Sequence, residues 1–181
     1  MSTCRYVNPF HHKWPTPIFW IILCNELGFC EYLNLPDIDF VLARLLKNAT
    51  DMGEMIRPIY GDAAAERYST LIKEHLLNAA DLVKAAIAGD EQAAKIAEQK
   101  WYANADEIAA FLISVHPYLT EQEVKKMFYQ HLALTKQEAV SMIMKDYQKD
   151  IEIYDEIEKQ ARQLADMISD AMIKLYPEKF R

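Results

Sequence analysis

Glycine is scarce in this chain, with only four among 181 residues, at Gly28, Gly53, Gly61 and Gly89, and never two close together. A phosphate-binding loop needs several neighbouring glycines so that the backbone can approach the phosphate, and no such run is present. No Asn-Gly or Asp-Gly turn joins two β-branched runs, so strand hairpins are not indicated. These absences argue against kinase activity and favour an all-α fold.

Cysteine is also rare, and its three copies, Cys4, Cys24 and Cys30, lie within the first thirty residues. An odd count does not suggest a disulfide framework, so we expect a reducing, cytoplasmic location. His11 and His12 lie nearby, but no Cys-x-x-Cys or ordered Cys/His spacing predicts a zinc site there.

An excess of basic charge is missing as well, because the formal net charge is −7 and the lysines and arginines are interspersed with acids. Nucleic-acid binding needs clustered Lys and Arg, so it is not expected, and neither is binding to an anionic membrane. Hydrophobic residues make up 51% and charged residues 26%, a balance typical of one globular domain.

The chain lacks a clean apolar run of membrane-spanning length. The segment from Ile18 to Leu33 comes closest, but it contains Asn25, Glu26 and Glu31. It also lacks a basic start and a small-residue cleavage site, so no signal peptide is expected. We interpret this segment as a buried or partner-facing helix and as a candidate surface for a protein partner or for self-association.

Prolines and glycines divide the chain into two unlike parts. Up to Gly61 they are frequent, and we expect only short helices: Pro17 to Tyr32, Pro36 to Lys47, and a brief third helix capped by Thr50. From residue 62 on they are rare. The prediction is a single domain in which residues 1–61 pack on or beside a bundle formed by residues 62–181.

Four long helices are expected in the second part. The first runs from Asp62 to Ala88, the second follows an Asp90 cap and ends near Val115, the third opens at a Thr120 capping box, and the fourth covers Tyr147 to Tyr176 after a turn at Lys145 to Asp150. Short connections make neighbouring helices antiparallel, so the predicted architecture is an up-down four-helix bundle preceded by short helices.

Four polar residues interrupt the apolar stripes of these helices: His75, Asn104, His131 and Glu138. Antiparallel helices meet at equal distances from their connection, so residues can be matched in height by counting from the turns. This counting places His75, Asn104 and His131 in one layer at mid-height, where the fourth helix contributes the small Ala161.

Two interpretations of this layer are open. In the first, His75 and His131 supply neutral imidazoles to a small ligand or to a divalent metal such as zinc, iron or nickel, with Asn104, Asp106 or Glu107 orienting them. In the second, the imidazoles and the amide satisfy one another in a buried hydrogen-bond network.

A ferritin-like di-metal centre is excluded by the residues that precede the two histidines. Such bundles use Glu-x-x-His, so that a carboxylate and an imidazole one turn apart face the same ions. Here the residue three before His75 is Ile72, and the residue three before His131 is Phe128.

Glu138 lies two turns beyond His131, too far along the helix axis to share one ion with it. The same counting puts Glu138 near Trp101 and Tyr154. A hydrogen bond from the tyrosine to the carboxylate is one interpretation, and a carboxylate with a raised pKa that acts as an acid or base is the other. No nucleophile or phosphate-binding loop accompanies it, so no reaction is assigned.

Several motifs together resemble a family of small, uncharacterised helical proteins found chiefly in Gram-positive spore-forming bacteria. The resemblance covers about Leu35 to Pro177 and rests on Leu35-Pro36-Asp37, Arg44-Leu45-Leu46-Lys47-Asn48, Trp101-Tyr102-Ala103-Asn104-Ala105-Asp106-Glu107-Ile108 and His131-Leu132-Ala133-Leu134-Thr135. It implies a helical fold and no established activity. Some members carry the label acetylglutamate kinase, an α/β enzyme whose glycine-rich loops four isolated glycines cannot build.

The chain departs from this family before Leu35. The members that it resembles begin with a helix carrying a Trp-x-x-His-Val-x-Trp-Thr-Arg-like pattern, whereas here only Phe10-His11-His12-Lys13-Trp14 and Phe19-Trp20 stand in an altered setting. If that helix supplies a third imidazole to the core layer in relatives, its loss would weaken a metal site in this chain.

The leading hypothesis from the sequence is a non-catalytic, cytoplasmic helical-bundle protein with a structural or partner-binding role. The alternative is a bundle that binds a divalent metal or small ligand through His75 and His131, and a third hypothesis is a metal-dependent transferase or hydrolase built on the same layer. The candidate ligand-binding residues are His75, Asn104, His131, Glu138 and Tyr154.

Overall fold

The computed structural model describes residues 36–180, which form five long α-helices and one short 3-10 helix. In chain order these are α2 (Ile38–Tyr60), α3 (Asp62–Ala88), α4 (Glu91–Val115), α5 (Glu121–Ile143), α6 (Tyr147–Leu175) and η1 (Pro177–Phe180). The described part of the chain contains no strand, so the all-α prediction is confirmed. The expected helix from Pro17 to Tyr32 and the apolar segment Ile18 to Leu33 lie outside these residues.

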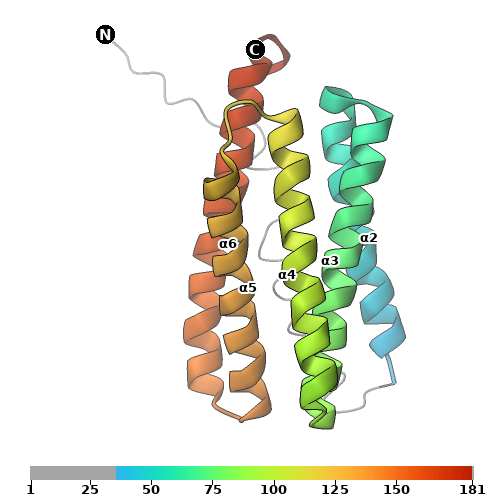
Figure 1. Ribbon diagram of the computed structural model, residues 1–181, viewed down its shortest axis with the longest axis vertical. Helices are drawn as coiled ribbons and strands as arrows, with labels where there is room; N and C mark the ends of the chain where they lie inside the picture. Colours follow the sequence, from blue (N-terminus) through green and yellow to red (C-terminus); the bar gives the residue numbers. More distant parts are fainter. Residues whose placement is uncertain (1–35, 181) are drawn as a thin grey trace.

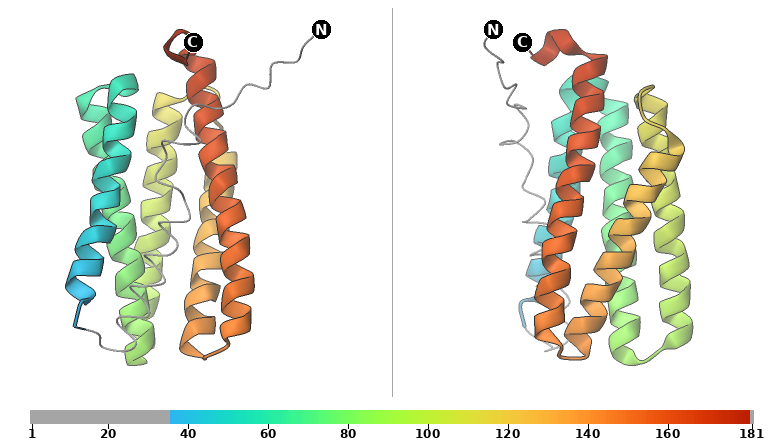
Figure 2. Two further views of the ribbon diagram at one scale, coloured as in Figure 1. Left: turned by 180° about the vertical axis from the view of Figure 1, so that it is seen from behind. Right: turned by 90° about the vertical axis from the view of Figure 1, so that its left-hand side faces the viewer.

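The five helices lie side by side along one long axis, and each runs antiparallel to the helix before it (Figure 1). α2 packs against α3, α3 against α4, α4 against α5, and α5 against α6. The α3–α4 turn and the α5–α6 turn therefore lie at the same end of the molecule, as both views of Figure 2 show. No helix within residues 36–180 is long and apolar enough to cross a membrane.

The expectation of short helices before residue 62 is wrong for the described part, because α2 is one continuous helix of 23 residues that contains both Gly53 and Pro58. Gly53 is buried where α2 meets α3: a Cβ atom there would lie 2.6 Å from the Ala65 carbonyl oxygen and 2.9 Å from Ser69 Cβ. Glycine thus permits close packing of the two helices and does not end α2.

Pro58 lies in the last turn of α2, where a missing backbone N–H costs little. α2 ends two residues later, at Gly61, whose φ of +82° favours glycine. The Lys179 Nζ donates to the Pro58 carbonyl oxygen at 3.0 Å, which ties the C-terminal residues to this helix end.

The expected ends of the later helices agree closely with the structure. The Asp90 carboxylate caps α4 by accepting a hydrogen bond from the Ala93 N–H at 2.9 Å. Thr120 caps α5 by accepting from the Glu123 N–H at 3.3 Å, and its hydroxyl donates to the Glu123 carboxylate at 2.6 Å. Both caps use side-chain oxygens to satisfy N–H groups that have no partner inside the helix.

The turns of the α3–α4 and α5–α6 hairpins are built alike. Gly89 ends α3 with a φ of +69°, and Lys145, 56 residues later, follows α5 with a φ of +60°. In both turns this residue's N–H bonds the carbonyl three residues back, and the next N–H bonds the carbonyl five residues back. An aspartate then caps the following helix, Asp90 in one hairpin and Asp146 in the other.

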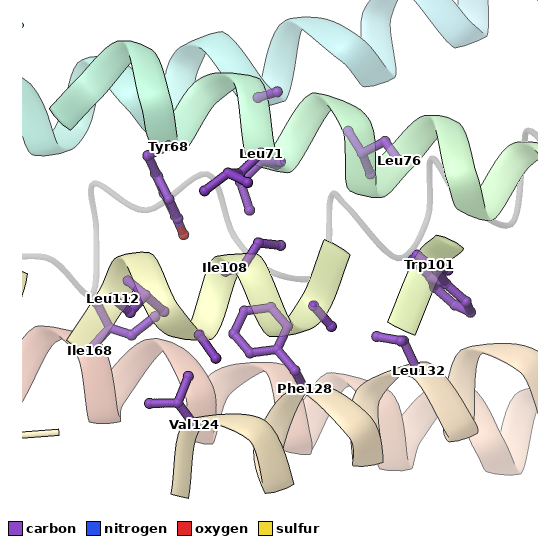
Figure 3. Packing of buried hydrophobic residues seen from close by; sticks show 14 of the residues in the cluster. Tyr68, Leu71, Leu76, Trp101, Ile108, Leu112, Val124, Phe128, Leu132 and Ile168 are labelled. Carbon is purple, nitrogen blue, oxygen red and sulfur yellow. The ribbon is translucent and has the colours of Figure 1, made fainter. Parts of the chain in front are cut away.

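One hydrophobic core cluster contains residues from all five helices. Figure 3 shows its central part, where side chains of α3, α4, α5 and α6 meet, among them Leu71, Ile108, Val124 and Phe128. A second, smaller cluster lies between α5 and α6 alone and consists of Ile153 and Ile157 with Leu134, Tyr154 and Ala161 packed against them.

Candidate functional site

His75 is held between α3 and α4 by a chain of hydrogen bonds. The Trp101 Nε1–H donates to His75 Nε2 at 3.1 Å, His75 Nδ1 lies 2.9 Å from Asn104 Oδ1, and Asn104 Nδ2 donates to the Leu71 carbonyl oxygen at 3.1 Å. An indole nitrogen only donates, so His75 Nε2 is the acceptor and the ring proton resides on Nδ1, which donates to Asn104. We call this set the His75 relay.

The His75 relay uses side chains at one-turn spacings on two helices. Trp101 and Asn104 are three residues apart on α4, and Leu71 lies four residues before His75 on α3. The predicted partnership of His75 with Asn104 is therefore present, with the indole of Trp101 as a third member that the sequence did not reveal.

The electrostatics of the relay keep the imidazole neutral. His75 is only 8% exposed, and burial lowers its pKa to about 3, with a smaller contribution from His131, whereas the hydrogen bond with Asn104 opposes the shift. Both ring nitrogens are engaged in the neutral form. No nitrogen lone pair of His75 remains for a metal ion or for a proton.

His131 belongs to a second relay, between α5 and α6. His131 Nδ1 lies 3.0 Å from Gln160 Oε1, and Gln160 Nε2 donates to the Met127 carbonyl oxygen at 2.8 Å. The sequence separations of 29 and 33 residues equal those of the corresponding bonds in the His75 relay. The two relays thus occupy equivalent places in the two hairpins.

The structure does not join the two histidines by a shared ligand or hydrogen bond. His131 is near enough for its charge to affect the pKa of His75, but its described hydrogen bond runs to Gln160 on α6 and not to Asn104. Burial lowers the pKa of His131, against the hydrogen bond with Gln160. The Phe128 ring lies edge-on to the His75 ring, with 6.2 Å between their centroids.

The two relays differ at one position. Trp101, which donates to His75 Nε2, corresponds to Ile157 in the second hairpin, 56 residues later. No group within residues 36–180 forms a hydrogen bond with His131 Nε2 in its place. His131 is half-buried, so this nitrogen is the open end of the second relay.

Asp106 and Glu107 do not orient either histidine, contrary to one of the expectations. Asp106 accepts a hydrogen bond from the Tyr129 hydroxyl at 2.7 Å, and Glu107 pairs with Arg67 at 2.8 Å, both at exposed positions. Positions two and three residues beyond Asn104 are rotated away from its face of the helix, which explains the difference.

Glu138 and Tyr154 lie near each other between α5 and α6, as the counting predicted. Glu138 is buried, and the pKa of Tyr154 is raised by burial first and then by the charges of Glu158 and Glu138. They are two turns from His131 along α5, so they do not form one site with the His75 relay.

A third buried histidine was missed by the sequence analysis. His116 caps the end of α4 at 1% exposure, and the Tyr60 hydroxyl lies 3.0 Å from its Nδ1. Burial lowers the pKa of His116 to about 4. His116 follows the last apolar position of its helix and precedes Pro117, so helical periodicity carried no signal for it.

Metal binding finds no ready-made site in the described part of the chain. Within residues 36–180, no group of three or more His, Cys, Asp or Glu side chains lies close enough to hold an ion. The cysteines and the pair His11 and His12 lie outside this range. The metal hypothesis through His75 and His131 stays a prediction.

No protein-family model, curated protein or solved structure matches the chain. The resemblance to a helical family of spore-forming bacteria therefore stays a prediction.

Proposed function

We propose that this chain is a non-catalytic, cytoplasmic helical scaffold whose role is structural or partner-binding. In this proposal α3 to α6 act as an up-down four-helix unit to which α2 is added. The observation that carries the proposal is the His75 relay, in which both nitrogens of the buried imidazole are already engaged by Trp101 and Asn104.

The relay supports a structural role because its chemistry is used up internally. A general base or metal ligand needs a ring nitrogen with a free lone pair, and His75 offers none. A fully satisfied polar network in a core instead favours one helix alignment, since any slip of α3 against α4 would leave buried groups unpaired at a cost of about 1–3 kcal/mol each.

Metal titration of the purified full chain tests this proposal. We expect no stoichiometric zinc, iron or nickel after purification and an unchanged melting temperature when these ions are added, because a metal bound to the folded state alone would raise it. One equivalent of metal that disappears in a His75→Ala variant would overturn the proposal and favour the metal-binding alternative.

Binding of a small ligand at His131 is a second candidate function, favoured by the open Nε2 of the second relay. With its Nδ1 proton donated to Gln160, this half-buried ring presents an acceptor to a ligand that carries an O–H or N–H group on an apolar body. The apolar cluster around Ile157 lies on the neighbouring turn of α6.

Phenol is a suitable probe for this second candidate. A titration followed by the ¹⁵N shift of His131 Nε2 should show saturable binding that is lost in a His131→Gln variant. The absence of a shift up to millimolar phenol would reject ligand binding at this nitrogen.

A further inference from the structure

The α5–α6 turn carries an exposed apolar surface. Val140, Met144, Tyr147 and Ile151 are 49%, 74%, 59% and 61% exposed and lie one turn apart in pairs on either side of the turn. We call these four residues the apolar tip. Contiguous exposed apolar surface on a folded domain usually marks an interaction site.

The first hairpin shows that the fold does not need this apolar tip. Its turn has the same backbone hydrogen bonds and the same aspartate cap, yet the corresponding residues, 56 positions earlier, are Lys84, Ala88, Glu91 and Lys95. Both turns lie at the same end of the molecule (Figure 1). The apolar residues at the second turn therefore serve something other than the turn itself.

A groove that could receive such a tip lies on the same hairpin at its opposite end. It runs between the start of α5 and the end of α6 and has a volume of about 590 Å³. Its apolar lining consists of Tyr118, Leu119, Met127, Met167 and Ala171. We call it the α5–α6 groove.

The charges beside the tip and the groove are complementary. On the groove, Lys126 and Lys174 form no ion pair within the described residues, and Lys174 Nζ instead lies 4.2 Å from the centre of the Tyr118 ring. Beside the tip, Asp150 has no cationic partner in the described range, and burial raises its pKa. Glu123 and Asp170 also line the groove, and Lys149 beside the tip pairs with Glu152, so each side carries both signs.

We propose that the apolar tip of one copy of this chain docks into the α5–α6 groove of a second copy, head to tail. The tip and the groove are different surfaces, so each copy can both donate a tip and receive one. Such a heterologous contact extends into a chain of copies unless the rotation between neighbours closes a ring. This proposal rests on the partner-binding role proposed above and names a second copy as the partner.

Light scattering of the full chain over a range of concentrations, with paired variants, tests the proposal. The tip variant Met144→Glu/Ile151→Glu and the groove variant Lys126→Glu/Lys174→Glu each change exposed residues and should fold. We expect the mass of the wild-type chain to rise above that of a monomer with concentration, and each variant alone to stay monomeric.

Mixing the two variants is the decisive step, because one intact tip and one intact groove remain. A one-to-one mixture should form a dimer that grows no further. The matched control, Ala88→Glu/Lys95→Glu, changes two of the corresponding positions of the first hairpin and should associate like the wild-type chain.

Several outcomes would overturn the proposal: a wild-type chain that stays monomeric, a groove variant that still associates through tip-to-tip contact, a monomeric mixture of the two variants, or dissociation caused by the control. Each is independent of the metal titration, so failure here leaves the scaffold proposal standing and identifies a different partner or none.

Discussion

At the scale of single residues, the decisive group is the neutral imidazole of His75. Its ring is buried, its proton is fixed on Nδ1 by the indole of Trp101, and its amide partner Asn104 passes the chain of hydrogen bonds to the backbone of α3. A charged ring at this place would lose the bond from Trp101, since an imidazolium has no acceptor. The site is therefore built for one protonation state.

The first prediction concerns the amide in this relay. Asn104→Leu keeps a similar volume but leaves the His75 Nδ1–H without its partner in the core, so the free energy of unfolding should fall by about 1–3 kcal/mol in urea denaturation. Gln92→Leu, at an exposed position of the same helix, is the control and should change it little. An Asn104→Leu protein as stable as the wild type would show that the relay contributes nothing.

The second prediction concerns pH. The folded-state pKa of His75 lies at about 3 and that of His116 at about 4, both below the unfolded value near 6.5, so the unfolded chain binds protons first. Their contribution to stability is complete above pH 7 and is lost as the pH falls through 6.5 towards these values, at about 1.4 kcal/mol per pH unit and histidine.

Urea denaturation between pH 7 and pH 5 measures this loss. A His75→Gln variant should lose stability less steeply with falling pH than the wild type, by about one proton. Identical slopes would contradict the buried, neutral state of His75.

The height of residues in the site could be predicted from the sequence, but their direction could not. Counting from Gly89 correctly brings His75 beside Asn104, because the rise per residue of a helix is fixed. Which way a ring turns depends on how neighbouring helices are rotated, and this is why His131 faces Gln160 and not the His75 relay. The indole of Trp101 reads as ordinary core packing until a nitrogen is found within its reach.

At the scale of helices, α2 shows how packing overrides local signals. Gly53 and Pro58 predict interruptions, yet α2 continues through both, because Gly53 is the contact point with α3 and Pro58 comes only in the last turn. The later helices were easier to predict, since Asp90, Thr120 and Gly89 mark their ends by chemistry that depends only on neighbouring backbone.

The third prediction tests the role of Gly53. Gly53→Ala would normally stabilise a helix, because alanine has the higher helix propensity. Here its Cβ would fall 2.6 Å from the Ala65 carbonyl oxygen, so we expect the free energy of unfolding to decrease, by about 1–3 kcal/mol. Chemical denaturation measures the sign, and a stabilised variant would show that α2 and α3 do not pack this closely.

At the scale of the whole molecule, the two hairpins share a turn and a relay but differ in how they join the core. The α3–α4 hairpin lies within the large cluster, whereas the turn end of α5–α6 depends on the small cluster of Ile153 and Ile157. This correspondence across 56 residues is nearly invisible in the sequence, because hydrogen-bond roles are kept while side chains change, as from Asn104 to Gln160.

The fourth prediction follows from this asymmetry. Regions with few buried apolar contacts open more easily, so amide hydrogens of α6 around Ile153 should exchange faster than those of α4 around Ile108. Native-state hydrogen exchange measures both in one experiment. Equal protection would contradict a less firmly packed end of the second hairpin.

The most direct test of the scaffold proposal is ¹⁵N NMR of the His75 ring in the full chain, recorded from pH 7 to pH 5 with and without added zinc. The account predicts a neutral ring protonated at Nδ1 and hydrogen-bonded at Nε2 throughout, unchanged by the metal. A ring that takes up a proton near pH 6.5, or a Nε2 resonance that shifts on zinc binding, would contradict it.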